Sequence, residues 1–173
     1  MDTTVPIDAA IRSRRTHKVY GSEPVARETL EELFELARWA PNHHLTEPWR
    51  FRVLGPAALA ALKEAAGAPD ASKLDRAPTL VVASVVQEGE ADRRLEDVCA
   101  GAVAVYIVLL AAHARGLAGY WRTPAVLGTA AGRDALGLGE AELPLGLIHL
   151  GPPRQEREPP ARTETAVVVT YLD

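Results

Sequence analysis

The chain has 173 residues, 47% of them hydrophobic, so it can bury a core and is not intrinsically disordered. Its formal net charge is −4 and no basic stretch dominates, which argues against nucleic acid as the main partner. Because Cys99 is the only cysteine, an intrachain disulfide is excluded, and we expect a cytoplasmic protein with one domain over residues 1–173.

Helices and short strands are predicted to alternate in the N-terminal half. We predict helices from Pro6 to near Ser13–Arg15 and over 26–39, a strand over 49–54, a helix over 57–66 and a strand over 79–86. The second helix has apolar residues at helical spacing, and the first strand alternates apolar and arginine side chains. The run 79–86 is rich in β-branched residues, which is typical of a central strand.

A long apolar helix is predicted in the C-terminal half. The run 98–112 lacks a polar face and is too short to span a bilayer, so no membrane anchor is expected. We expect the helix over 93–115 to be covered on all sides, within one domain or across a subunit contact. Cys99 lies in this run and is predicted to be an inert core residue.

The remaining elements complete an α+β layered domain. They are a strand over 117–121, a helix that begins at Thr123-Pro124, a short helix and turn over 132–140, a strand over 145–150, an extended stretch over 154–162 and a strand over 166–172. A terminal strand stays ordered only when something pairs with it. The last strand is therefore a second indication of a subunit contact.

The first candidate site is a cationic block, Arg14-Arg15-Thr16-His17-Lys18. Guanidinium forks, a point charge and a hydroxyl within five residues are the donors that a phosphate needs. The alternative is a solvated helix end whose cations complement the helix dipole. The hydroxyl of Thr16 among the cations favours the phosphate site.

The second candidate site is the turn Ala40-Pro41-Asn42-His43-His44, which leads into Pro48-Trp49-Arg50-Phe51. A turn between a predicted helix and a predicted strand is a usual place for binding residues. A metal site is not supported, because adjacent histidines rarely ligate one ion and no cysteine or carboxylate lies at ligand spacing. Each histidine is either a surface group or a hydrogen-bonding partner for the polar edge of a cofactor.

The third candidate site is Gly119-Tyr120-Trp121-Arg122-Thr123-Pro124. A buried aromatic residue followed by a helix cap explains this block without any ligand. The functional alternative is that an arginine and the amides of a helix N-terminus stabilise an anionic ring. The chain has no Gly-x-Gly-x-x-Gly motif and no Walker loop, so neither a Rossmann dinucleotide site nor a P-loop is supported.

Taken in order, these blocks resemble the flavin-dependent nitroreductase family. The first block, extended to Tyr20, is similar to the family's Arg-Arg-Ser-x-Arg-x-Phe signature, with Thr, Lys and Tyr as replacements. The second is similar to Ala-Pro-Ser/Asp-x-x-x-x-x-Pro-Trp-x-Phe, and Gly151-Pro152-Pro153 follows a predicted strand as in the family. The resemblance covers nearly the whole chain.

The small, short members of the family, those like the bacterial YdjA proteins, are the most similar. They have a Trp-Arg-Ser segment where larger members have Glu-Gly, and this chain has Trp121-Arg122-Thr123. The resemblance implies a nitroreductase-like α+β fold, with a central mixed or antiparallel sheet flanked by helices. It further implies an intertwined homodimer with FMN at the subunit interface.

The implied activity is that of an NAD(P)H-dependent flavin oxidoreductase. NAD(P)H would deliver hydride to flavin N5, and a nitroaromatic, quinone or similar acceptor would then take its place in a ping-pong cycle. Because the flavin carries the redox chemistry, no catalytic side chain and no metal are expected. The alternatives are a flavin protein of the same fold with flavin fragmentation or dehalogenation chemistry, and a non-enzymatic flavin- or anion-binding module.

The resemblance also implies roles for individual residues. The FMN phosphate and ribityl chain would be held by Arg14, Arg15, Thr16 and Lys18, and joined by Arg162. The cofactor would be reached from the partner subunit by His43, with Trp39 and Glu47 near it. The isoalloxazine would be lined by Trp121, Arg122 and Thr123, and the nicotinamide nucleotide site by Arg115 and Gly116.

Overall fold

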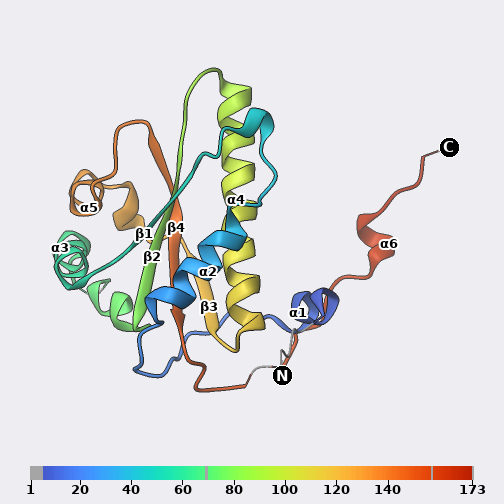
Figure 1. Cartoon of the computed structure of the whole chain (residues 1–173), viewed down its shortest axis with the longest axis horizontal. Coiled ribbons are helices and arrows are strands. Elements are labelled where there is room, and N and C mark those ends of the chain that lie inside the picture. The colour runs from blue at the N-terminus through green and yellow to red at the C-terminus, as the bar shows by residue number, and fades with distance from the viewer. Residues whose placement is uncertain (1–5, 69, 157, 173) are drawn as a thin grey trace.

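The computed structural model describes residues 6–68, 70–156 and 158–172, which fold into a four-stranded sheet between two helix layers (Figure 1). The strands are β1 (Trp49–Val53), β2 (Thr79–Val86), β3 (Ala118–Arg122) and β4 (Glu142–Gly151). They pair in the order β1-β2-β4-β3, and each of these pairings is antiparallel. The predicted α+β class with a helix-flanked central sheet is confirmed.

The helices divide between the two faces of this sheet. One face carries α2 (Arg27–Ala37) and α4 (Ala91–Ala114), and the other carries α3 (Pro56–Ala66) and α5 (Ala130–Leu136) (Figure 1). Two further helices, α1 (Ile7–Ser13) and α6 (Thr165–Val168), lie outside the layers (Figure 1). Short 3-10 turns are η1 (His43–Leu45), η2 (Ala71–Asp75) and η3 (Ala125–Gly128).

The core consists of two apolar clusters, one on each face of the sheet. Strand β2 contributes to both, and its residues from Thr79 to Val85 are all buried, as predicted for a central strand. Helix α4 approaches the sheet closely at Gly101, where an added Cβ would lie 2.3 Å from Val85 Cγ1 and 2.6 Å from Leu145 Cδ1. Any larger residue at this position would push the helix away from the sheet.

The prediction of a C-terminal strand over 166–172 is wrong for the described chain. Helix α6 begins this segment, which then continues without regular structure and extends away from the body of the molecule (Figure 1). Tyr171 and Leu172 are each 90% exposed. A β-branched run forms a strand only where a neighbouring strand supplies hydrogen bonds, and this segment lies too far from the sheet for that.

The prediction that α4 is covered on all sides within one domain is wrong, and the alternative, cover across a subunit contact, stays a prediction. The helix buries the faces toward the sheet and α2, but Val103 is 39% exposed and Tyr106 36% exposed. Cys99 is exposed as well, so it is not a core residue. By length and composition alone α4 would pass as a membrane span, and half of its apolar window is buried inside the protein.

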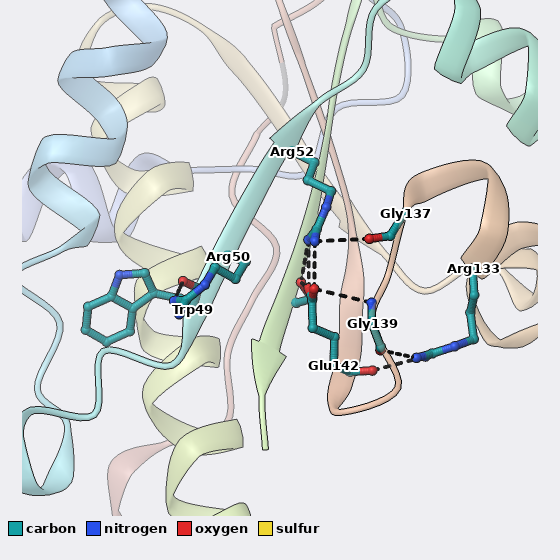
Figure 2. Close-up of polar contacts among 8 residues, drawn as sticks. Trp49, Arg50, Arg52, Arg133, Gly137, Gly139 and Glu142 are labelled. Atoms are coloured by element: carbon teal, nitrogen blue, oxygen red, sulfur yellow. Dashed lines mark hydrogen bonds and ion pairs between the residues drawn. The ribbon is translucent and has the colours of Figure 1, made fainter. Parts of the chain in front are cut away.

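One ion pair and several hydrogen bonds join β1, β2 and β4 to α5 and the segment that follows it (Figure 2). Arg52 donates from Nη1 and Nη2 to the two carboxylate oxygens of Glu142, at 2.7 and 2.6 Å. Ser84 Oγ donates to the same carboxylate at 2.7 Å, and Arg133 Nη1 donates to the Glu142 carbonyl at 3.0 Å. The hydrogen bond from Arg52 lowers the pKa of Glu142 to about 2, against the opposing effect of burial.

Candidate functional site

The N-terminal cationic block lies beside strand β3. Thr16 forms a parallel bridge with Gly119, and the His17 backbone N–H donates to the Gly119 carbonyl at 3.2 Å. Tyr20 forms a second bridge, with Pro153. This pairing brings the first and third blocks together at one edge of the sheet, although about a hundred residues separate them in the sequence.

Arg15 binds to the C-terminal end of α1, which is the alternative to phosphate binding that the sequence left open. Its Nη1 and Nη2 donate to the carbonyls of Arg14 and Arg12, at the C-terminal end of α1. Those carbonyls have no partner within the helix, so the guanidinium satisfies them. The Arg15 Nε is nevertheless buried and without a hydrogen-bond partner among the described residues.

Arg14 differs from its neighbour because no described residue accepts a hydrogen bond from its guanidinium. Its Nε is buried without a partner. Its Cζ lies 5.5 Å from the centre of the Tyr106 ring, within the range of a cation–π contact. Arg14 is therefore held against α4 while its charge remains available for an anion.

Lys18 and Arg122 add cations on the opposite face of the same edge. Lys18 Nζ lies 5.9 Å from the centre of the Tyr120 ring, and Tyr120 packs against the core cluster of the α3 and α5 face. Arg122 follows Tyr120 by two residues and so points to the same side of the strand. Its Nη1 is buried without a partner among the described residues.

His149 lies next to this pair and is fully buried. Its ring centre is 5.7 Å from that of Tyr120, and neither ring nitrogen has a partner among the described residues. Burial, assisted by the charges of Arg122 and Arg76, lowers the pKa of His149 to about 4. The imidazole is therefore neutral at pH 7, and the positive charge of the site comes from the lysine and the arginines.

Trp121 is a half-buried aromatic residue that packs against the core. Its Nε1 donates to the Leu145 carbonyl at 3.0 Å, and its side chain packs against the core cluster of the α2 and α4 face. The prediction that Thr123 caps a helix is wrong. The next helical turn is the short η3, which has Pro124 at its N-cap and no side-chain cap, whereas Thr129 caps α5. Thr123 instead lines an open hollow of about 290 Å³ together with Arg122.

The Pro/Asn/His turn lies near the other end of α4. His43 Nδ1 is 2.7 Å from Glu96 Oε2, near the start of that helix, whereas Ser13 Oγ is 2.7 Å from His113 Nε2 near its end. Those two helix positions are about 26 Å apart along the axis, at 1.5 Å per residue. Within one chain, the structure does not bring His43 to the cationic block.

The turn that carries His43 has a strained backbone. His44, Leu45 and Glu47 have positive φ angles of 52°, 51° and 42°, which non-glycine residues rarely adopt. The Glu47 N–H donates to Asn42 Oδ1 at 2.9 Å, which helps to hold this conformation. Trp39 beside the turn is 77% exposed. Strain and exposed aromatic surface of this kind are often found at binding sites.

Arg115 and Arg162 lie apart from this edge, whereas Gly116 shares a cavity with Arg15. Arg115 Nε donates to Glu32 Oε2 at 3.0 Å, so its side chain links α4 to α2. Gly116 ends α4 with a φ of 74° and lines an open cavity of about 310 Å³ together with Arg15 and His113. Arg162 is exposed in the segment that leads to α6.

Sequence patterns could not reveal two of the neighbours of the cationic block. Tyr106 contacts Arg14 from the middle of α4, and His149 contacts Tyr120 from β4. Neither belongs to a motif, and both are far from residue 14 along the chain. Only the packing of α4 and β4 around β3 brings them to the site.

Comparison with known proteins identifies relatives of this chain. The sequence model of the Nitroreductase family matches residues 11–152. The chain is 31% identical to the "Putative NAD(P)H nitroreductase YfhC" of Bacillus subtilis, over 88% of this chain and 87% of that protein. It is 30% identical to the "Putative NAD(P)H nitroreductase YdjA" of Escherichia coli, over 73% and 77% respectively.

A solved structure described as a putative nitroreductase in complex with FMN, from Desulfovibrio desulfuricans, has the same fold. It superposes with a TM-score of 0.81 at 26% identity, and the alignment covers 99% of both chains. The predicted nitroreductase-like fold and the resemblance to small YdjA-like proteins are confirmed.

Proposed function

The chain belongs to the nitroreductase family, and from this premise we propose that it is an FMN-dependent NAD(P)H oxidoreductase of the cytoplasm. The observation that carries the proposal is the edge of the sheet where Arg14, Arg15 and Arg122 keep buried nitrogen atoms without partners. Buried donors are normally satisfied, and a phosphorylated ligand would supply the missing acceptors. FMN is the ligand in the complex from Desulfovibrio desulfuricans.

The residues at this edge would hold FMN in defined ways. Arg14 would bind the phosphate, with Thr16 donating its hydroxyl and Arg15 assisting through its Nε. Lys18 and Arg122 would place positive charge beside the ring system. When bound, FMN supplies hydride transfer between NAD(P)H and an electron acceptor such as a nitroaromatic or a quinone. The protein would position the reactants and limit the access of water.

Four further residues, all in the C-terminal half of the chain, are included in this proposal. Thr123 and the backbone at Trp121 would lie along the isoalloxazine, because both are next to Arg122. Gly116 would line the site of the nicotinamide nucleotide, in the cavity that it shares with Arg15. Arg162 would reach the phosphate only if its exposed segment folded onto the site or onto a second subunit.

We propose that the active form is a homodimer. The exposed stripe on α4 contains Leu95, Cys99, Val103 and Tyr106, and a hollow of about 490 Å³ beside it is lined by mostly apolar surface. The C-terminal segment carries further exposed apolar side chains and lies away from the body (Figure 1). A second copy would cover both surfaces and bring its own His43, Trp39 and Glu47 to the flavin.

The absorption spectrum of the purified protein is the first test. We expect a yellow protein that releases about one FMN per chain, and a rise in melting temperature on adding FMN, since a ligand at about 100 times its Kd adds roughly 2.7 kcal/mol. Steady oxidation of NADH or NADPH with a nitroaromatic or a quinone would support the proposed reaction. A protein whose stability does not respond to saturating FMN would contradict the proposal, and flavin binding without NAD(P)H oxidation would favour flavin fragmentation or dehalogenation.

The oligomeric state is tested separately. Light scattering should give a dimer at micromolar concentration, and deletion of residues 164–173 should weaken assembly and FMN binding together. A stable, folded monomer that binds FMN fully would contradict the proposed role of a second copy.

A further inference from the structure

Tyr106 contacts Arg14, the cation proposed to bind the phosphate. It lies in the middle of α4, and its ring centre is 5.5 Å from Arg14 Cζ. His113, two helical turns further along the same face, is 2.7 Å from Ser13, the residue that precedes Arg14. Helix α4 therefore contacts the end of α1 at two consecutive residues.

We propose that Tyr106 is a positioning residue for the phosphate site, which holds the Arg14 guanidinium in its binding orientation before the ligand arrives. This inference rests on the proposed binding of FMN. The Tyr106 hydroxyl would not contact the phosphate, because the side chain acts only through the contact between its ring and the Arg14 guanidinium.

The physical reason is the geometry of the guanidinium. Its N–H donors lie in the plane of the group, and a contact with an aromatic ring 5.5 Å from Cζ leaves them free for phosphate oxygens. A long arginine side chain loses rotamer freedom when it binds, and a side chain that is already restrained loses less. The buried, unpartnered Nε of Arg14 shows that the side chain is packed and not extended into solvent.

The alternative is that Tyr106 only contributes apolar surface to α4 or to a contact between subunits. That role would affect every flavin alike, because it acts on the fold. A role through Arg14 affects only ligands that carry a phosphate. FMN and riboflavin differ in that group alone, so the pair separates the two roles.

The experiment measures the dissociation constants of FMN and riboflavin for the full-length protein, by flavin fluorescence, together with melting temperatures. Tyr106→Leu removes the ring and should weaken FMN binding about three- to tenfold, the range of a partly exposed cation–π contact. Riboflavin binding should stay within twofold of that of the wild type, as a rough limit for an unperturbed site. Tyr106→Phe keeps the ring and should restore wild-type affinity for FMN.

A double-variant cycle completes the test. In the Arg14→Ala protein, the additional change Tyr106→Leu should cause no further loss of FMN affinity, because the residue through which it acts is gone. If Tyr106→Leu does not fold, Tyr106→Met provides the same comparison. Equal weakening of FMN and riboflavin, a Phe variant as weak as the Leu variant, or additive losses in the cycle would each overturn the inference.

The result also separates this inference from the proposed function. A wild-type protein that binds FMN, with unchanged FMN affinity after Tyr106→Leu, contradicts the role of Tyr106 alone. A wild-type protein that binds neither flavin contradicts FMN binding itself, and the inference with it.

Discussion

Two arginine clusters in this molecule differ in how their charges are satisfied. Around Glu142, Arg52 makes two short contacts with one carboxylate and Arg133 donates to a backbone carbonyl (Figure 2). At the edge of β3, Arg14 and Arg122 form no ion pair with a described residue, although Asp70 lines the same hollow as Arg122, and each arginine keeps a buried nitrogen without a partner. The first cluster is paired within the folded chain, whereas the second forms no ion pair with the described residues.

The difference separates structural from functional arginines. A paired, hydrogen-bonded charge contributes to folding, and its removal leaves an uncompensated partner. An unpaired cation costs stability unless a ligand satisfies it. Changes in the first cluster should therefore affect the free energy of unfolding, and changes in the second should affect ligand affinity.

The largest expected effect is that of Glu142→Ala. It leaves the partly buried Arg52 without its carboxylate, so the free energy of unfolding should fall by about 3 kcal/mol. FMN affinity of the folded variant should remain unchanged, because the network lies away from β3. Urea unfolding and a flavin titration measure the two quantities. A marked loss of FMN affinity would mean that the two clusters are coupled.

Arg14→Ala should have the opposite pattern. Loss of a charge-assisted contact to phosphate costs about 1.5–3 kcal/mol of binding free energy, or a ten- to hundredfold change in Kd. The free energy of unfolding of the flavin-free protein should change by only about 0.5 kcal/mol. Wild-type FMN affinity in this variant, and also in Thr16→Ala, would place the phosphate elsewhere.

Acid should weaken the first cluster through Glu142. Because its pKa of about 2 in the folded chain is below its ordinary value of 4.5 in an unfolded chain, the unfolded state binds more protons between these values. The stabilisation is thus fully present above pH 4.5 and is lost as the pH falls toward 2. Between pH 4.5 and 3 the loss should be about 2 kcal/mol, and Glu142→Gln should be less sensitive to pH in this window. Equal acid sensitivity of both proteins would contradict the assignment.

The smallest expected effect is that of Arg15→Ala. Because this guanidinium satisfies carbonyls at the end of α1, its loss should reduce the free energy of unfolding by about 1 kcal/mol. FMN affinity should fall less than in Arg14→Ala, since only the Nε of Arg15 lacks a partner. A loss of affinity equal to that of Arg14→Ala would show that both arginines bind the phosphate directly.

Local patterns in the sequence were sufficient for most elements of the fold. The β-branched run of β2, the apolar spacing of α2 and the apolar character of α4 reflect burial against immediate neighbours, which leaves a periodic signal in the chain. The same logic failed for residues 166–172. A β-branched composition indicates that a segment can form a strand, but it does not indicate whether a partner strand lies close enough to pair with it.

For the site, the sequence by itself determined which residues carry charge and which family the chain resembles. Only the tertiary structure decided that Arg15 satisfies the end of α1 while Arg14 rests on Tyr106. It also decided that Trp121 is half-buried against the core and that Arg115 is paired with Glu32. The physical reason is that charge is a property of one residue, whereas its availability depends on groups that are distant in the chain and adjacent in space.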